Sequence, residues 1–328
     1  MNHGGNVWEK GSPSGWMDFS VNLRPDGPPF WISEAIHSAQ RYTGFYPDPE
    51  MKRAGKGIAA FLGIPEERVL PVPGGIAAID LALSLSPGCV YTQPPTFSEY
   101  ARRATIHGRP GAVWTGNCRE GDTLVICNPN NPTGSIQTRQ ELLGTLDGLA
   151  ENGGELLIDE AFIEYCAEYS MRGCIRPGLI IAGSLSKILG TPGIRLGYLC
   201  AEPETIRTLR QMILPWQLDA FATEVAVRIP EHTDDIRADA VRNTERRKDF
   251  AGMLQELGAE VYPSGGNFLL VDFHRDMSPA AEQLKARSIL VRTCASFGLP
   301  DSFLRLAVKR EKENERLVNE LEEILHVR

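Results

Sequence analysis

The segment GLIIAGSLSKILGTPGIRLGY (178–198) places one lysine, Lys187, in a turn of serines and glycines directly after an apolar run. The run GLIIAG is typical of a buried strand in a parallel sheet. A lysine whose only requirement is contact with solvent does not need a turn of small residues at the end of such a strand. The setting therefore points to a lysine that bonds covalently to a ligand carrying a phosphate group.

Around this segment, short apolar runs alternate with amphipathic stretches from about residue 50 to residue 200. The apolar runs predict strands and the stretches between them predict helices. We expect strands at 68–71, 89–93, 123–127, 155–159, 179–183 and 195–200, and helices at 50–62, 76–85, 97–106 and 138–152. This alternation predicts an α/β fold with a mostly parallel sheet that is covered on both faces.

The C-terminal part of the sequence has a different pattern. We expect a long polar helix at 233–257, two strands around the Gly-rich turn of AEVYPSGGNFLLVDF (259–273), a helix at 279–287, strands in ILVRT (289–293) and FLRLAV (303–308), and a charged helix at 311–326. This order predicts a smaller α+β domain over 226–328, beside a large domain over 31–225. The Pro- and Gly-rich residues 1–30 are too irregular to stand alone, so we expect an N-terminal arm that docks on the small domain.

The composition of the chain excludes several classes of function. A formal net charge of −8 over 328 residues argues against nucleic acid or an acidic membrane as a partner. No apolar run is long enough to span a membrane, and MNHGGNVWEKGSPSGW (1–16) has no signal-peptide core. The seven cysteines form no CxxC pair and the six histidines form no HxxH motif. We therefore expect reduced core cysteines, no metal site and a cytoplasmic location.

Four of the expected strands are followed by polar or glycine-rich loops, namely PGGIAA (73–78), NPNNPTG (128–134), DEAF (159–162) and SLSK (184–187). Ligands of open parallel sheets bind beyond the carboxyl ends of the strands, so these loops should meet at one edge. Gly74 and Gly75 open a helix whose free N–H groups suit a phosphate. The Ser184 and Ser186 hydroxyls and the charge of Arg195 would complete a phosphate site.

Each of these features also has a purely structural explanation. The two glycines could form a plain turn, and the NPNNPTG loop could be set by its prolines alone. Asp159 ends an apolar strand, where its carboxylate needs a cation or donor; a protonated ring nitrogen, a helix N-cap or an arginine would serve. If that ring belongs to a bound ligand, the side-chain amide of Asn131 could donate a hydrogen bond to an oxygen on it. A covalent lysine, a phosphate site and a carboxylate for a ring nitrogen, all at one edge, jointly indicate pyridoxal phosphate.

Four motifs in this order, YPDP (46–49), NPNNPTG (128–134), DEAF (159–162) and SLSKILGTPGIRLGY (184–198), resemble those of fold-type I pyridoxal phosphate enzymes, the aminotransferase class I/II family. The resemblance covers essentially the whole chain. It implies that Lys187 joins the cofactor covalently, that Asp159 pairs with the ring nitrogen and that Asn131 bonds the ring hydroxyl. It also implies that Ser184, Arg195 and the backbone at Gly74–Gly75 hold the phosphate, together with Ser186.

The same resemblance assigns roles at the cofactor to three aromatic residues. Phe97, in PPTFSEY (94–100), matches the aromatic residue that stacks on the cofactor ring, and Phe162 lies beside the ring oxygen. Tyr46 matches the tyrosine that members of the family pass across a dimer interface to the neighbouring cofactor phosphate. We therefore expect a homodimer whose sites are shared between subunits.

Within the family, the segments HGGN (3–6), DFSVNLRPDGPP (18–29) and VRTCASFG (291–298) most resemble L-threonine-O-3-phosphate decarboxylases of cobalamin biosynthesis. There a histidine and small-domain arginines hold the substrate's phosphate and carboxylate, which implies substrate contacts by His3, Asn22, Arg292 and Arg305. Phe162 is consistent with this resemblance. Histidinol-phosphate aminotransferases usually have the motif DEAY, with a tyrosine at this position, whereas this chain has DEAF. The expected reaction converts L-threonine O-3-phosphate to (R)-1-amino-2-propanol O-2-phosphate and carbon dioxide.

Three alternatives stay open at this point. The chain could be an aminotransferase acting on histidinol phosphate or another amino acid, or a non-catalytic relative. Ser184–Lys187 also matches the S-x-x-K motif of penicillin-interacting serine enzymes, but the K-T-G motif and secretion signal of that family are missing from the sequence. In addition, the loop Gly74–Ala77 lacks the polar side chains usual in the decarboxylases, so backbone groups must replace hydroxyls there.

Overall fold

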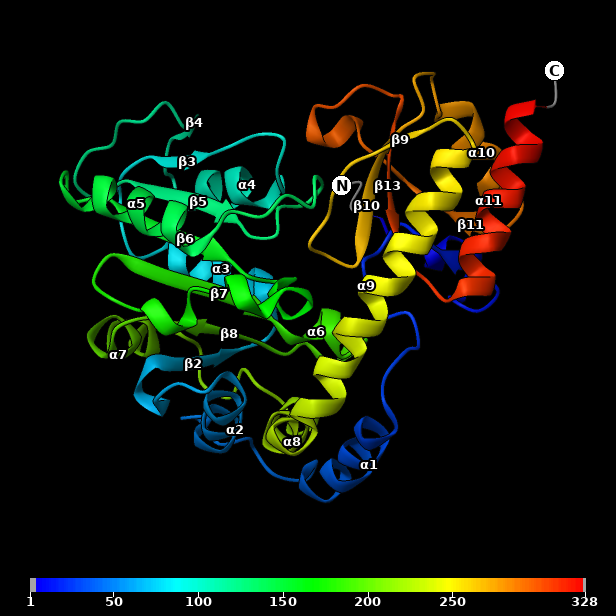
Figure 1. The fold of residues 1–328 in the computed structure, drawn as a ribbon. Helices are drawn as coiled ribbons and strands as arrows, with labels where there is room; N and C mark the ends of the chain where they lie inside the picture. Colours follow the sequence, from blue (N-terminus) through cyan, green and yellow to red (C-terminus); the bar gives the residue numbers. More distant parts are fainter. Residues whose placement is uncertain (1–3, 327–328) are drawn as a thin grey trace.

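The structure is a computed structural model and describes residues 4–326. Its larger part is built on a seven-stranded sheet with the strand order β2-β8-β7-β6-β5-β3-β4 (Figure 1). The strands are β2 (Val69–Val72), β3 (Val90–Thr92), β4 (Gly111–Val113), β5 (Thr123–Cys127), β6 (Glu155–Asp159), β7 (Leu179–Ser184) and β8 (Gly197–Cys200).

This sheet is mostly parallel, as the sequence predicts. Only β8 runs against its neighbours, and it is antiparallel to both β2 and β7. Every residue of β2, β5 and β8 is buried, which is the pattern of strands covered on both faces. The sequence did not predict β4, because its exposed residues Gly111–Val113 show neither an apolar run nor alternation. It becomes a strand by pairing with β3 at the edge of the sheet.

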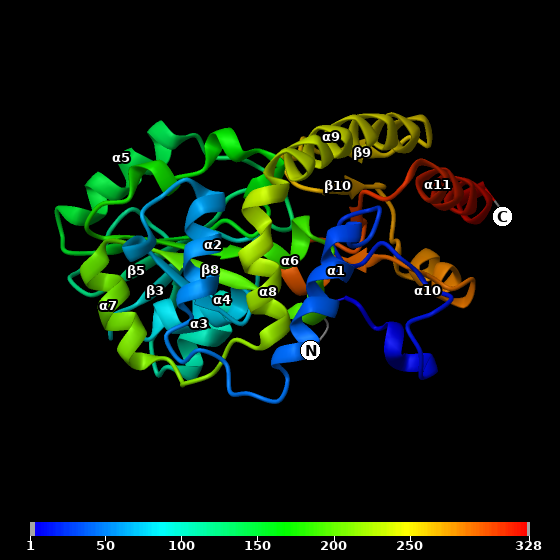
Figure 2. The same ribbon diagram turned by 90° about the horizontal axis from the view of Figure 1, so that it is seen from below.

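Helices pack around the sheet and enclose a hydrophobic core that reaches from Trp31 to Ile236 and includes Phe268. They are α1 (Phe30–Ala39), α2 (Lys52–Leu62), α3 (Gly75–Leu83), α4 (Glu99–Ile106), α5 (Arg139–Ala150), α6 (Leu185–Ile188), α7 (Pro203–Met212) and α8 (Ala220–Arg228). α1, α2 and α8 form one group, below the sheet in Figure 1 and facing the viewer in Figure 2. Local signals set several helix ends: Thr138 and Glu141 form a capping box before α5, and Gly63 ends α2 in a left-handed conformation.

The C-terminal part forms a smaller α+β domain, which confirms the predicted fold class. Its sheet has the order β12-β13-β10-β9 and is antiparallel throughout. Its elements are β9 (Glu260–Val261), β10 (Phe268–Asp272), α10 (Ser278–Ala286), β12 (Arg292–Thr293), β13 (Phe303–Ala307) and α11 (Glu311–His326). The long helix α9 (Thr233–Glu256) contributes Ile236 to the first core and Phe250 to a second core, so the domain limit at residues 225 and 226 stays a prediction.

The N-terminal arm contacts the smaller domain. Its strand β1 (Met17–Asp18) pairs in parallel with β11 (Ile289–Leu290), and Phe19 is buried in the second core. The segment 289–293, predicted as one strand, is therefore divided. Its first half pairs with the arm and its second half, β12, pairs with β13.

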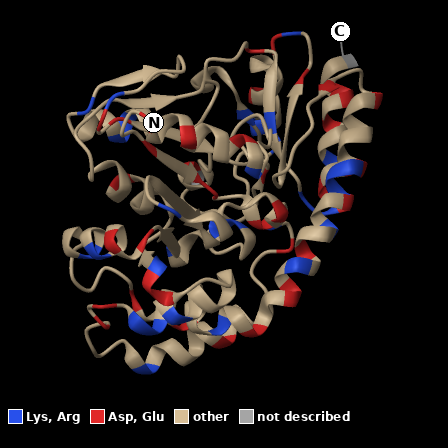
Figure 3. Cartoon of the chain, turned by 60° about the vertical axis from the view of Figure 1, so that its left-hand side comes forward, with Lys and Arg blue, Asp and Glu red and all other residues tan. Residues whose placement is uncertain are grey.

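None of the helices within residues 4–326 is long and apolar enough to cross a membrane. Figure 3 shows Lys and Arg interspersed with Asp and Glu along the outer helices. On these helices the acidic side chains thus alternate with basic ones and do not form a single acidic run.

Candidate active site

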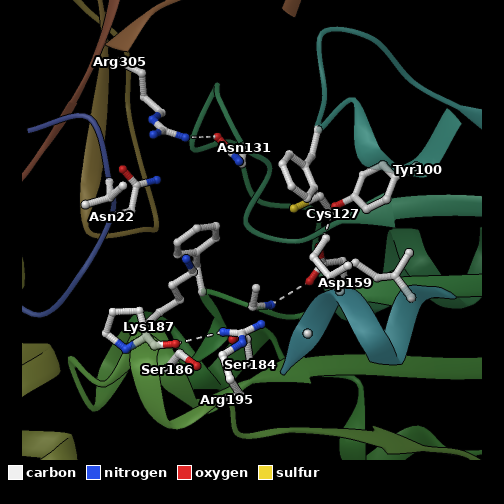
Figure 4. Close-up of a pocket in the computed structure, with 18 of the residues that line it drawn as sticks. Asn22, Tyr100, Cys127, Asn131, Asp159, Ser184, Ser186, Lys187, Arg195 and Arg305 are labelled. Carbon is white, nitrogen blue, oxygen red and sulfur yellow. Dashed lines mark hydrogen bonds between the residues drawn. The ribbon is translucent and has the colours of Figure 1, made fainter. Parts of the chain in front are cut away.

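The polar loops that follow β2, β5, β6 and β7 meet at one edge of the large sheet, as predicted, and line a cavity of about 220 Å³ (Figure 4). The predicted site residues that line it are Asn22, Gly75, Phe97, Asn131, Asp159, Phe162, Ser184, Ser186, Lys187, Arg195 and Arg305. The arm, both domains and four loops therefore contribute to one cavity.

Lys187 lies in the short helix α6, which begins directly after β7 and is anchored by the buried side chains of Leu185 and Ile188. Burial, together with the positive charges of Arg305 and Arg195, lowers the pKa of the Lys187 amine to about 8, against the attraction of Asp159. An ordinary lysine amine is almost fully protonated at neutral pH. The amine of Lys187 is thus prepared to act as a nucleophile or to exchange a proton near neutrality.

Asp159 ends β6 and is buried, with 5% of its surface exposed. Its Oδ2 accepts a hydrogen bond from the Tyr100 hydroxyl at 2.6 Å, and its Oδ1 accepts one from the Ala161 backbone N–H at 3.0 Å. Burial raises the pKa of Asp159, while these two donors and the charge of Lys187 lower it. A buried carboxylate in this position is best stabilised by a cation that enters the cavity.

Gly74 and Gly75 form the start of α3 beside Ser184 and Arg195. Gly74 has a φ of 95°, and a Cβ there would lie 2.3 Å from a terminal nitrogen of Arg195. A Cβ at Gly75 would lie 3.0 Å from the Cβ of Ser184. The positive φ of Gly74 favours glycine, and Gly75 packs tightly against Ser184. The first N–H groups of α3 are available to an anion.

Two polar side chains in the cavity are buried without a hydrogen-bond partner among residues 4–326. They are the Ser186 hydroxyl and the Asn22 amide, in which neither the oxygen nor the nitrogen is paired. Ser186 is 2% exposed and Asn22 is 3% exposed. Buried polar groups are nearly always satisfied, so both side chains call for a polar ligand in the cavity.

Arg305 connects the small domain to the loop that follows β5. Its guanidinium donates to the Asn131 Oδ1 at 2.7 Å (Figure 4) and to the Ser20 carbonyl oxygen. Since the amide oxygen of Asn131 is occupied, its N–H groups are those that remain for a ligand. Two of the five N–H donors of Arg305 are used in these bonds, which leaves donors for an anionic ligand.

Arg292 does not line this cavity. It lies opposite Arg305 in the β12–β13 pair and lines a neighbouring cavity of about 140 Å³, together with Gly4 and Lys285. Ser20 lines both cavities. The two arginines therefore serve adjacent spaces instead of a single cleft, and His3, which precedes Gly4, lies outside the described residues.

Two other predicted residues do not line the cavity of their own chain. Gly74 lies next to it, and its conformation makes room for Arg195. Tyr46 is 82% exposed and lies against Trp216, with 4.9 Å between ring centroids. In one chain alone Tyr46 thus does not line the cavity, and its role across a dimer interface stays a prediction.

Three further residues that the sequence did not indicate also line the cavity, namely Ser20, Tyr100 and Cys127. Tyr100 lies three residues after Phe97, and this helical spacing was the available signal. Cys127 ends an apolar strand, which by itself indicates only a core cysteine. Ser20 contributes a backbone oxygen to Arg305, a role that its side chain cannot reveal.

The cavity fits pyridoxal phosphate on three counts. It combines an amine of lowered pKa at Lys187, a buried carboxylate at Asp159, and a glycine loop beside Arg195 in which a Cβ would collide. The unpaired Ser186 hydroxyl lies at the same end of the cavity as Arg195 (Figure 4). These groups would hold the aldehyde carbon, the ring nitrogen and the phosphate of the cofactor, respectively.

Comparison with known proteins supports the same conclusion. The family model for aminotransferase class I and II matches residues 14–321. The chain is 30% identical to a histidinol-phosphate aminotransferase of Moorella thermoacetica, over 94% of the chain and 85% of that protein. It is 28% identical to a threonine-phosphate decarboxylase of Salmonella typhimurium, over 98% and 96%. The solved histidinol-phosphate aminotransferase from Clostridium acetobutylicum superposes with a TM-score of 0.86 at 26% identity, covering 94% of this chain and 98% of that one.

Proposed function

The chain belongs to the aminotransferase class I and II family of pyridoxal phosphate-dependent enzymes, and from this premise we propose that it decarboxylates L-threonine O-3-phosphate or a close analogue. The products are (R)-1-amino-2-propanol O-2-phosphate and carbon dioxide. Bound pyridoxal phosphate supplies an electron sink for whichever Cα bond of the substrate stands perpendicular to its ring. The residues that hold the anionic groups of the substrate therefore choose the bond.

The observation that carries this proposal is the pair of adjacent cavities with one buried arginine each. Arg305 is 5% exposed and Arg292 is 4% exposed, and Ser20 lines both spaces. Two separate cations suit a substrate that bears both a carboxylate and a phosphate. O-phosphothreonine has both groups, whereas histidinol phosphate has a phosphate and no carboxylate.

In this proposal Arg305 and Asn22 bind the carboxylate, and Arg292 with His3 binds the phosphate. Lys187 donates the proton that replaces carbon dioxide at Cα, because its amine has a lowered pKa and lies in the same cavity. The enzyme is a homodimer in which Tyr46 reaches the phosphate loop of the partner subunit. The exposure of Tyr46 and of Trp216, whose ring lies against it, 82% and 48%, supports an interface on this face.

Release of labelled carbon dioxide from carboxyl-labelled O-phosphothreonine tests the proposal. We expect release at the same rate with and without 2-oxoglutarate, because decarboxylation needs no amino-group acceptor. Unphosphorylated L-threonine is the matched control. It should react about ten- to a hundredfold more slowly, since it lacks the charged contact to Arg292.

Two results would contradict the proposal. If no carbon dioxide appears and histidinol phosphate converts 2-oxoglutarate to glutamate, the chain is an aminotransferase, the activity of its 30% identical relative. If neither substrate reacts although the cofactor binds, the chain is a non-catalytic relative.

The pH dependence of cofactor uptake tests the state of Lys187 separately. Only the neutral amine can bond to the aldehyde of pyridoxal phosphate, and the pKa of Lys187 is lowered to about 8. The rate of covalent uptake by the cofactor-free protein should therefore fall about tenfold per pH unit below 8 and level off above it. An ordinary lysine would keep gaining rate up to its much higher pKa. Stopped-flow absorbance measures the rate, and a plateau only above about pH 10 would contradict the lowered value.

A further inference from the structure

Tyr100 lies next to the carboxylate of Asp159. It is in the first turn of α4 and is fully buried, with 0% exposure. Its hydroxyl donates to the Asp159 Oδ2 at 2.6 Å (Figure 4), while the Ala161 N–H occupies the other oxygen at 3.0 Å. Each oxygen of the carboxylate is thus held by a separate donor, and its direction in the cavity is fixed.

The direction of this hydrogen bond follows from the surroundings of the two groups. Burial raises the pKa of Tyr100 well above its ordinary value, and the charge of Asp159 raises it further. The phenol therefore keeps its proton and is the donor. The other ionisable groups that face Asp159 are Lys187 and the thiol of Cys127, whose pKa is raised by burial. Tyr100 is consequently the one neutral side-chain donor among these groups that supports the carboxylate as an anion.

The ring of Tyr100 has a second contact in the same cavity. It meets the ring of Phe97 edge to face, with 5.6 Å between centroids and 85° between planes. Phe97 also lines the cavity and is the residue expected to stack on the cofactor ring. One side chain thus contacts both the group assigned to the ring nitrogen and the group assigned to the ring face.

We propose that Tyr100 is a positioning residue whose hydroxyl holds Asp159, as an anion, against the protonated ring nitrogen of the cofactor. This inference rests on pyridoxal phosphate binding in the cavity and on the proposed role of Asp159. It does not depend on whether the reaction is decarboxylation or transamination. Tyr100 acts through its neighbours and itself contacts no reacting atom.

The replacement Tyr100→Phe separates the hydroxyl from the ring, because it keeps the contact with Phe97 and removes the bond to Asp159. The full chain is freed of cofactor and titrated with two ligands: pyridoxal phosphate, and its analogue in which a C–H group replaces the ring nitrogen. We expect Tyr100→Phe to bind pyridoxal phosphate about tenfold more weakly and the analogue almost as well as the unmodified chain does. A residue needed only for packing would weaken both ligands alike.

Two controls make the result specific. Tyr91→Phe removes a hydroxyl from a tyrosine that also meets an aromatic partner, Trp114, edge to face at 5.3 Å but does not line the cavity. It should change neither affinity. In an Asp159→Asn background, Tyr100→Phe should cause no additional loss for pyridoxal phosphate, because the acceptor of its bond is already altered. Thermal midpoints of all variants show whether each chain is folded.

The proposal is overturned if Tyr100→Phe weakens the two ligands equally, if it weakens neither, or if its loss adds fully to that of Asp159→Asn. A different failure concerns the site itself. If the unmodified chain binds the two ligands equally well, Asp159 does not pair with the ring nitrogen. Tyr100 then cannot have the proposed positioning role. The carbon dioxide assay is independent of either outcome, so the reaction and the positioning role are judged apart.

Discussion

Replacement of Lys187 by alanine is expected to abolish turnover, with a loss of at least about a thousandfold in kcat/KM. Lys187 is the buried amine of the cavity, and it lies between the positive charges of Arg195 and Arg305. Alanine removes both the nucleophile that holds the cofactor and the proposed proton donor to Cα. It also removes a buried positive charge that these arginines disfavour, so the variant should remain folded.

Mass spectrometry after borohydride reduction provides the direct measurement. The unmodified chain should carry the reduced cofactor on the peptide that contains Lys187, and the alanine variant should carry none. Lys187→Arg is the matched control, because it keeps a cation at this place but cannot become neutral near pH 8. It should be as inactive as the alanine variant. A label on another lysine would show that the assignment of the site is wrong.

The same variant tests the shared site of the proposed homodimer. Tyr46→Phe should weaken cofactor retention about tenfold to a hundredfold, by removing one hydrogen bond to a charged phosphate. When Lys187→Ala and Tyr46→Phe subunits are coexpressed, the mixed dimer has one site with both native residues. At a cofactor concentration too low to load the Tyr46→Phe parent, the activity of the mixed dimer should exceed that of either parent. If mixing restores nothing, Tyr46 does not act across an interface.

Much of this site could be predicted because the functional residues follow strands. In parallel sheets the carboxyl ends of the strands meet, so Asp159, Asn131 and Lys187 were brought to one edge by topology alone. Gly74 and Gly75 were recognisable as a turn before a helix, and Gly74 has the positive φ that favours glycine. For these residues, the local sequence and the parallel arrangement of the strands together determine where the side chains lie.

Features that depend on distant pairing could not be predicted in the same way. The segment Ile289–Thr293 is divided because the arm competes for its first half, which no local pattern encodes. Arg292 and Arg305 are paired across β12 and β13 but line different cavities, both of which Ser20 of the arm also lines, and no local pattern shows this. Tyr100 was missed for a similar reason, since its spacing places it on a helix turn but does not show which group its hydroxyl meets.

Replacement of Arg305 should give the second large loss of activity, because Arg305 both contacts the substrate in our proposal and holds Asn131 in place. Burial lowers the pKa of Arg305 to about 10, so it stays charged at neutral pH. Its guanidinium spans the Asn131 Oδ1 and the Ser20 carbonyl, which the single amine of lysine cannot do. We expect Arg305→Lys to lower kcat/KM by at least about a hundredfold, from a lost carboxylate contact and a released Asn131.

The matched control is Arg292→Lys, at the position opposite Arg305 in the β12–β13 pair. Every α-amino acid substrate has a carboxylate, so Arg305→Lys should lower kcat/KM for O-phosphothreonine and for threonine by the same factor. Arg292→Lys should lower it for O-phosphothreonine alone, because threonine has no phosphate to lose contact with. Steady-state carbon dioxide release with both substrates gives the two ratios. If Arg305→Lys affects only the phosphorylated substrate, the two arginines have exchanged roles, and the carboxylate is held near Arg292.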